Sequence, residues 1–466
     1  MKLAYQIKDK PPFGKNIIYA LQQVLAIMAA TILVPKIVGH GLTPAAAMFG
    51  AGVGTIVYLL FTRFKSPVFL GSSFAFLGSM AAAFAGGVSM QLGALGLILG
   101  AIFAGLVYVI IAIVVKFAGV KWIDKIMPAV VIGPTVAIIG LSLAGNAISN
   151  VQTSDVPKGS MYIALLCGLV TLFVTMIVST YGSKQLKLIP FIIGIVAGYI
   201  VALIFTLIGK GAGVDSLKII DLDIFKKTML SDEGKVTFQT FLALPSFTFL
   251  DAGKGLKEFS GSYLATIMIA YVPVAFVVFA EHIADHKNLS SIIEKDLLED
   301  PGLSNTLLGD GVGSMAGAFF GGCPNTTYGE SVGCVAITGV ASTWTILFAS
   351  ILCVLISFFT PFVAFLDSIP DCVMGGVCIA LYGFIAVSGL KMIQKVDLNK
   401  NRNLFVVSVI LIAGIGGLSL SFLVDKVNDI SITITSIACA LILGIITNLI
   451  LSKEKDNAAD QQNDEK

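Results

Sequence analysis

Apolar segments recur along almost the whole of this 466-residue chain, and they restrict its fold more than any other feature. A helix needs about 17–25 mostly apolar residues to cross the hydrocarbon core of a bilayer. Fourteen segments meet this requirement: 16–37, 43–62, 67–86, 92–116, 128–146, 161–181, 186–209, 262–288, 303–322, 323–340, 342–366, 369–390, 402–423 and 432–452. The pattern predicts an all-α, polytopic membrane protein with fourteen transmembrane segments.

Composition and charge exclude several other classes of protein. Hydrophobic residues make up 56% of the chain and charged residues only 12%, which is outside the range of soluble domains. A formal net charge of +2 gives no basic field for nucleic acid. The seven cysteines stand singly in apolar surroundings without a C-x-x-C pair, so we expect reduced thiols and no metal site.

The distribution of basic residues predicts the orientation of the chain. Lysine and arginine gather in the loops on the N-terminal side of the membrane, for example at Lys8, Arg63 and Lys184. Because basic loops stay in the cytoplasm, both termini are expected there, in a protein of the cell membrane. The N-terminus shows no cleavable signal, and the polar tail 453–466 is expected to be disordered.

Two segments, 67–86 and 323–340, open with Pro-containing or Gly-rich sequence that does not begin as regular helix. They are the third and the tenth segments, seven apart in order. Two similar hexapeptides, Pro128-Ala-Val-Val-Ile-Gly133 and Pro370-Asp-Cys-Val-Met-Gly375, stand at the start of segments five and twelve, which are also seven apart. Since seven is odd, two seven-helix halves would have opposite orientations. Unwound segments in matching places of an inverted repeat are typical of the substrate site of a transporter.

Three carboxylates lie close to these interruptions in sequence or in the expected fold. Glu330 follows Thr326-Thr-Tyr-Gly, while Glu281 and Asp285 are four residues apart and share a helical face. An ionised carboxylate in hydrocarbon costs several kcal/mol, so acids inside the membrane usually have a function, such as carrying a proton. The alternative without a function is that Glu281 lies at the membrane interface, at the end of its helix. The neighbouring His282 and His286 fit supporting or interfacial positions.

Other functions find less support in the sequence. Gly311-Val-Gly-Ser-Met-Ala316 loosely fits a dinucleotide fingerprint, but no strand precedes it, so we interpret Gly313 and Gly317 as helix contacts. No H-E-x-x-H motif or nucleophile–base pair indicates a membrane-embedded enzyme, and no catalytic residue is assigned. An anion exchanger would place a basic residue near the broken helices, and 323–340 contains no lysine or arginine.

Several strings together resemble the bacterial uracil permeases of the nucleobase–ascorbate transporter family, also described as uracil/xanthine permeases. They are Gly71-Ser-Ser-Phe-Ala-Phe76, Ala280-Glu-His282, Lys295-Asp-Leu-Leu298 with Asp300-Pro-Gly-Leu303, and Pro324-Asn-Thr-Thr-Tyr-Gly-Glu330. The resemblance runs from about residue 11 to 450. It implies a 7+7 inverted repeat, short antiparallel strands in segments three and ten, proton-coupled nucleobase uptake and often a homodimer.

The resemblance also implies a core domain and a gate domain, each made of two stretches of the chain. We expect the core to comprise 16–127 and 262–366, and the gate to comprise 128–209 and 367–452. An extracellular connection (210–261) would join the two halves, with cytoplasmic tails at 1–15 and 453–466. Alternating access between core and gate would then carry the substrate across.

The residues that form the substrate site in the family match seven positions of this sequence. The binding glutamates match Glu281 and Glu330, the stacking aromatic matches Phe74, and the backbone contacts match Tyr328 and Gly329. Further lining positions match Ala30 and Tyr382. No metal or organic cofactor is implied, and H⁺ is the expected coupling ion.

Two departures from the family pattern concern the coupling route. Many relatives have Gln-His where this chain has Gln22-Gln23, and some uracil permeases have a histidine in place of Asp285. The coupling proton would then be shared by Glu281 and Asp285, or His286 would carry it instead. Uracil, xanthine or another purine, and H⁺ or Na⁺, stay open as alternatives; Ala-Glu-His and Thr-Thr-Tyr-Gly-Glu favour uracil.

Overall fold

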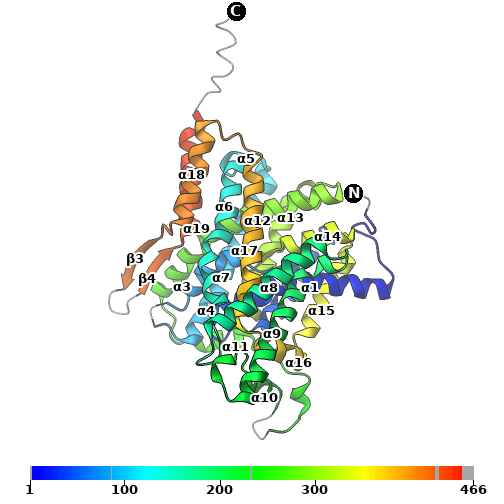
Figure 1. Ribbon diagram of the computed structural model, residues 1–466. Helices are drawn as coiled ribbons and strands as arrows, with labels where there is room; N and C mark the ends of the chain where they lie inside the picture. The colour runs from blue at the N-terminus through cyan, green and yellow to red at the C-terminus, as the bar shows by residue number, and fades with distance from the viewer. Residues whose placement is uncertain (1–2, 86, 231–233, 426–429, 454–466) are drawn as a thin grey trace, which may run out of the picture.

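A computed structural model describes residues 3–85, 87–230, 234–425 and 430–453, and it is predominantly helical. The all-α architecture is confirmed (Figure 1). Short antiparallel strands in the third and tenth segments are confirmed as well. Within the described part of the chain, eight helical stretches are long and apolar enough to cross a membrane. They are α1 (Phe13–Val38), α2 (Pro44–Phe61), α4 (Met90–Ala118), α6–α7 (Ala129–Ser142 and Ala144–Val151), α8 (Met161–Tyr181), α9 (Pro190–Ala212), α12 (Gly261–Ile293) and α17 (Asp371–Ile393).

The other predicted segments contain shorter or broken elements, so the count of fourteen crossings is not confirmed. These elements are α3 (Leu77–Ala82), α13 (Leu303–Gly321), α14 (Gly329–Thr338), α15 (Thr343–Ile356), α16 (Thr360–Ser368), α18 (Asn401–Ile415) and α19 (Ser436–Ile450). Short connecting elements are α5 (Lys121–Ile126), α10 (Asp223–Met229), α11 (Thr248–Gly255) and turns at Phe74–Phe76, Leu186–Leu188, Asp215–Leu217, Phe238–Thr240, Leu298–Gly302 and Leu451–Lys453.

The prediction of helices over 402–423 and 432–452 is wrong at the end of the first and at the start of the second. Helix α18 stops at Ile415, and an antiparallel hairpin of β3 (Leu420–Asp425) and β4 (Ile430–Ile434) follows. Gly417 adopts a left-handed conformation at φ 74° just after the helix, where glycine is favoured. Figure 1 shows this hairpin projecting from the helical body. The predicted tail beyond residue 453 lies outside the described residues.

Strands β1 (Leu70–Ser72) and β2 (Asn325–Thr327) bring the two irregular segments together. They pair antiparallel, with Gly71 opposite Thr326, although about 250 residues separate them in sequence. Ser73 N–H extends the pairing by donating to Pro324 O at 2.9 Å. The interrupted segments therefore meet at one crossing point in the interior.

Close glycine contacts hold the helices around this crossing. Helix α2 packs against α13, where Gly54 and Gly313 face each other's backbone carbonyls and leave no room for a side chain. Gly317 lies against Gly50 of α2 as well as against the Asn325 side chain. The interpretation of Gly313 and Gly317 as helix contacts is thus confirmed, and a dinucleotide-binding turn has no place in the fold.

Helices α6 and α17 begin directly after Pro128 and Pro370, the two matching hexapeptides, and pack along each other. Gly140 of α6 lies against the backbone of α17 at Tyr382. The division into core and gate domains stays a prediction, because contact between these helices does not establish how they move.

Candidate functional site

Two helical segments start at the strand crossing and present their N-terminal ends to it. After β1 the chain turns through Phe74–Phe76 into α3, and after β2 it enters α14 at Gly329. No side chain caps the start of α14, where Tyr328 occupies the N-cap position. Backbone N–H groups in the first turn of a helix lack intrahelical partners and favour acceptor groups of a ligand.

Tyr328 supports this geometry from behind. Its hydroxyl donates to Ser72 O at 2.7 Å and so ties the end of β2 to the end of β1. A Cβ on Gly71 would lie 2.5 Å from the Tyr328 ring, so the ring fits only because residue 71 is a glycine. In this structure Tyr328 braces the crossing with its side chain, and its backbone leads directly into Gly329.

Three carboxylates surround the start of α14. Glu281 and Asp285 come from α12 and Glu330 from α14; their charges are close enough to interact. Thr327 Oγ1 donates to Asp285 Oδ2 at 2.8 Å, and Asp285 Oδ1 faces Gly329. These three acids and Gly329 retain accessible surface while most of their neighbours are buried. No other described residue donates a hydrogen bond to the carboxylate of Glu281 or Glu330, so both keep free acceptors.

The aromatic and small residues expected at the site lie around the same region. Phe74 is 7% exposed, and its ring meets Tyr382 of α17 edge to face at a centroid distance of 5.4 Å. The Tyr382 hydroxyl is buried without a partner among the described residues. Ala30 of α1 is buried, and α1 contacts both β1 and α14. The structure therefore brings Phe74 and Tyr382 together from two separate helical groups.

Gln23, at the position where many relatives have a histidine, also reaches α14. Its Nε2 lies 3.5 Å from Ser331 O, while its buried Oε1 has no partner among the described residues. Ser331 in turn accepts the Phe69 N–H at 3.2 Å. The amide can thus support the first turn of α14, and its free oxygen offers one more acceptor.

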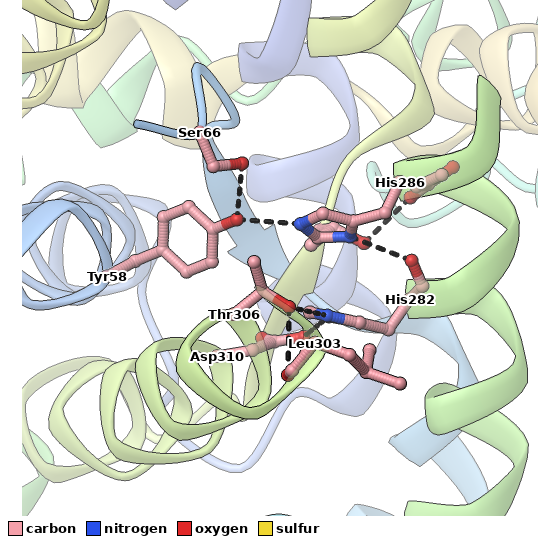
Figure 2. A network of polar contacts seen from close by, with 9 residues as sticks. Tyr58, Ser66, His282, His286, Leu303, Thr306 and Asp310 are labelled. Carbon is pink, nitrogen blue, oxygen red and sulfur yellow. Dashed lines mark hydrogen bonds and ion pairs between the residues drawn. The ribbon is translucent and has the colours of Figure 1, made fainter. Parts of the chain in front are cut away.

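A buried polar network extends from His282 and His286, on the adjoining face of α12, to residues of α13 and α2 (Figure 2). His282 Nδ1 lies 2.7 Å from Asp310 Oδ2, and its Nε2 lies 3.0 Å from Thr306 Oγ1. Thr306 Oγ1 donates to Leu303 O at 3.1 Å. His282 and Asp310 have no exposed surface. The pair therefore holds α12 against α13 and limits the rotation of α12 about its own axis.

His286 belongs to this network rather than to the carboxylate cluster. Its Nδ1–H donates to His282 O at 2.8 Å, and its Nε2 lies 2.7 Å from the Tyr58 hydroxyl. The Tyr58 hydroxyl also lies 2.7 Å from Ser66 Oγ (Figure 2). Of the two expected routes for the coupling proton, the structure places Asp285 beside the crossing, hydrogen-bonded to Thr327, and turns His286 toward Tyr58.

Asp310 and Tyr58 were absent from the residues that the sequence suggested. Asp310 is a carboxylate inside the apolar segment 303–322, so the rule that singled out Glu281 applies equally to it. Tyr58 carries no such signal, because a tyrosine near a helix end is ordinary in a membrane protein.

Comparison with known proteins identifies the family. The model of the Permease family matches residues 14–423. A uracil permease of Bacillus caldolyticus is 38% identical over 453 residues, covering 97% of this chain and 95% of the relative. Those of Bacillus subtilis strain 168 and Escherichia coli strain K12 are 36% and 35% identical, covering 98% and 96% of this chain and 98% and 94% of the relatives.

Solved structures with the same fold come from more distant transporters. The transmembrane domain of the cyanobacterial bicarbonate transporter BicA superposes with a TM-score of 0.61 at 15% identity, covering 95% of this chain and all of that domain. The murine Solute Carrier 26 family member A9 gives a TM-score of 0.58 at 12% identity, covering 96% of this chain and 69% of that protein. At these identities the likeness concerns the fold alone.

The near full-length relatives and the motifs at the strand crossing agree with each other. The molecule is a multi-pass membrane transporter and not an enzyme. The chain belongs to the uracil/xanthine permease family, the nucleobase–ascorbate transporters, and is similar to its bacterial uracil permeases.

Proposed function

We propose that this protein takes up uracil across the cytoplasmic membrane by symport with protons. The observation that carries the proposal is the cluster of Glu281, Asp285 and Glu330 around the uncapped start of α14. Relatives named uracil permeases that match nearly the whole chain support the choice of substrate.

The chemistry of the site fits the edges of a pyrimidine. Uracil has two N–H donors and two carbonyl acceptors on a flat neutral ring. The free carboxylate oxygens of Glu281 and Glu330 match the donors, and backbone N–H groups at Gly329 match an acceptor. Phe74 supplies an aromatic face for stacking, while Ala30 and Tyr382 limit the space around the ring.

Coupling to protons follows from the crowding of acids. A neutral substrate gains nothing from the membrane potential, so its accumulation requires a co-transported ion. Three neighbouring carboxylates repel one another when all are ionised, and a proton shared between Glu281 and Asp285 relieves this repulsion. The hydrogen bond from Thr327 fixes Asp285 beside Glu281's helical face, which favours Asp285 over His286 as the partner. No metal or organic cofactor is part of this proposal.

Transport would proceed by alternating access between the core (16–127 and 262–366) and the gate (128–209 and 367–452). The contact between Phe74 of the core and Tyr382 of the gate lies on the boundary that such a movement would open. We place both termini in the cytoplasm and propose a homodimer, as the family resemblance implies.

Xanthine is the second candidate substrate, because the matching family includes xanthine permeases. Thermal shift of the purified protein with uracil, xanthine, uric acid and guanine separates the two. We expect protection by uracil. Protection by xanthine without protection by uracil would overturn the proposed substrate.

The coupling ion is tested separately in proteoliposomes. Uracil uptake is expected to follow an imposed pH gradient, acidic outside, in nominally Na⁺-free buffer. A strict requirement for Na⁺, with no response to the pH gradient, would contradict proton coupling while leaving the substrate assignment intact.

A further inference from the structure

An open groove lies at the far end of α14, about two helical turns from Glu330. Its volume is about 760 Å³. It is lined by Leu3, Ala4, Lys184, Ala336, Ile337, Thr338 and Gly339. Lys184 lies in the connection between α8 and α9, whereas Ala336, Ile337 and Thr338 form the end of α14 and Gly339 is its C-cap. The groove therefore lies between two regions of the fold. Its lysine places it on the side that the sequence predicts to be cytoplasmic.

A small apolar cluster lies one helical turn along α14 from the residues that line this groove. Ala26 of α1, Leu188 after α8 and Cys334 of α14 pack together and are 8%, 7% and 4% exposed, with Ile189 beside them. The cluster contains one residue from each of three separate elements. We refer to Ala26, Leu188 and Cys334 as the inner plug.

Helical spacing places the inner plug between the groove and the candidate site. On α14, Cys334 is one turn beyond Glu330, about 6 Å along the axis, and Thr338 is one turn further at the groove. On α1, Ala26 is one turn from Ala30. Residues four apart share a helical face, so both helices run from site to plug, and α14 continues to the groove.

We propose that the inner plug is the cytoplasmic gate of the transport pathway and that the groove is the vestibule through which the nucleobase leaves. The proposal rests on the proposed function for its substrate. By helical spacing the plug lies one turn from the site and one turn from the groove, and two of its three residues, Ala26 and Cys334, are small. Displacing Leu188 together with the gate domain would open a passage along one face of α14. Lys184, exposed at the rim, marks the outlet.

Enlarging the plug tests the proposal. Leu188→Trp should reduce uracil uptake at least tenfold while the Kd for uracil changes by less than about threefold. Leu186 lies on the same short turn but is 44% exposed and outside the plug, so Leu186→Trp is the matched control and should transport within twofold of the unmodified protein. Unimpaired uptake by Leu188→Trp, or equal impairment of the control, would overturn the gate.

Cys334 provides a second test that needs neither transport nor uracil. In a variant that keeps Cys334 as its only cysteine, N-ethylmaleimide applied to inside-out vesicles reaches the plug through the groove. Adding Leu188→Ala should raise the labelling rate at least fivefold; Leu186→Ala should not. An unchanged rate in Leu188→Ala would refute the gate even if Leu188→Trp did not accumulate. Absence of uracil binding by the unmodified protein would instead refute the proposed substrate.

Discussion

His282 and Asp310 form a hydrogen-bonded pair, Nδ1 to Oδ2 at 2.7 Å, with neither side chain exposed. The pair joins α12 to α13. Glu281 directly precedes His282 and Asp285 follows one turn later, so holding His282 against α13 limits the rotation of the helix that carries both carboxylates. We expect the network to support the carboxylates rather than to contact the substrate.

Tyr58→Phe is expected to destabilise the protein without abolishing binding. The change removes the hydroxyl that contacts both His286 and Ser66, and an unsatisfied buried polar group costs about 1–3 kcal/mol. We expect a lower melting temperature in detergent and a Kd for uracil within about threefold of the unmodified protein.

Tyr108→Phe is the matched control for Tyr58→Phe. Tyr108 is also buried, and its ring lies 6.1 Å from that of His282, but its hydroxyl has no hydrogen-bond partner among the described residues. Its removal should leave the melting temperature unchanged or slightly higher. Equal loss of stability in both variants would contradict the role assigned to the Tyr58 hydroxyl.

Gly71→Ala should displace Tyr328 and disturb the crossing. A Cβ at position 71 would lie 2.5 Å from the Tyr328 ring, and moving the ring breaks the bond to Ser72 O. We expect uracil uptake to fall at least tenfold. Gly333→Ala on α14 meets no atom within 4 Å and should transport normally, so normal uptake by Gly71→Ala would show that the ring position is unimportant.

Phe74→Ala is expected to weaken uracil binding. Stacking of a base on an aromatic side chain contributes about 1–3 kcal/mol, which corresponds to roughly a 5–150-fold higher Kd. Isothermal titration of the purified protein measures the change. Phe319→Ala, at a peripheral position that is 43% exposed, serves as the control. An unchanged Kd for Phe74→Ala would remove Phe74 from the site.

Asp155 makes the stability of the loop before α8 depend on pH. It accepts the Asp371 N–H with both oxygens, at 3.1 and 3.2 Å. Partial loss of hydration, together with the nearby charge of Asp371, raises the pKa of Asp155 from 3.8 to about 6. A carboxyl whose pKa is raised by folding favours the folded state at low pH, and this contribution is lost as the pH rises from about 4 to about 6.

Asp155→Asn should therefore have a higher melting temperature than the unmodified protein at pH 7.5 and the same one near pH 4. The amide oxygen can still accept the Asp371 N–H, and it carries no charge. Asp215→Asn is the opposite control, because Lys218 lowers the pKa of Asp215 and the charge is favourable there. Lower stability of Asp155→Asn at pH 7.5 would contradict the sign of the effect.

The broken segments could be predicted from sequence because glycine, proline and polar residues interrupt their apolar pattern. Inside a membrane such an interruption occurs only where the backbone N–H and C=O groups find hydrogen-bond partners outside the helix. Gly71 and Thr326, which pair across the crossing, both come from such runs. The β3–β4 hairpin could not be predicted. Its apolar residues fit the end of a helix as well as a strand, and periodicity alone does not separate the two.

The supporting network could be predicted only to a limited extent. Asp310 was visible as a charge in an apolar segment, but its partner His282 lies 28 residues away, and the pairing depends on how α12 packs on α13. The sequence also left two candidates for the coupling route, a Glu281–Asp285 pair or His286. Their different surroundings result from the rotation of α12, which the sequence pattern does not specify.

The central claim is that Glu281 and Glu330 bind the nucleobase, and conservative substitutions in proteoliposomes test it most directly. Glu281→Gln and Glu330→Gln keep the shape of the side chain but remove the negative charge that accepts the substrate's N–H groups. Asp223→Asn, in the exposed helix α10, controls for loss of an acid elsewhere. We expect each glutamine variant to fold and to lose uracil uptake, with normal uptake by the control. Uptake at the unmodified rate by either glutamine variant would contradict the proposed site.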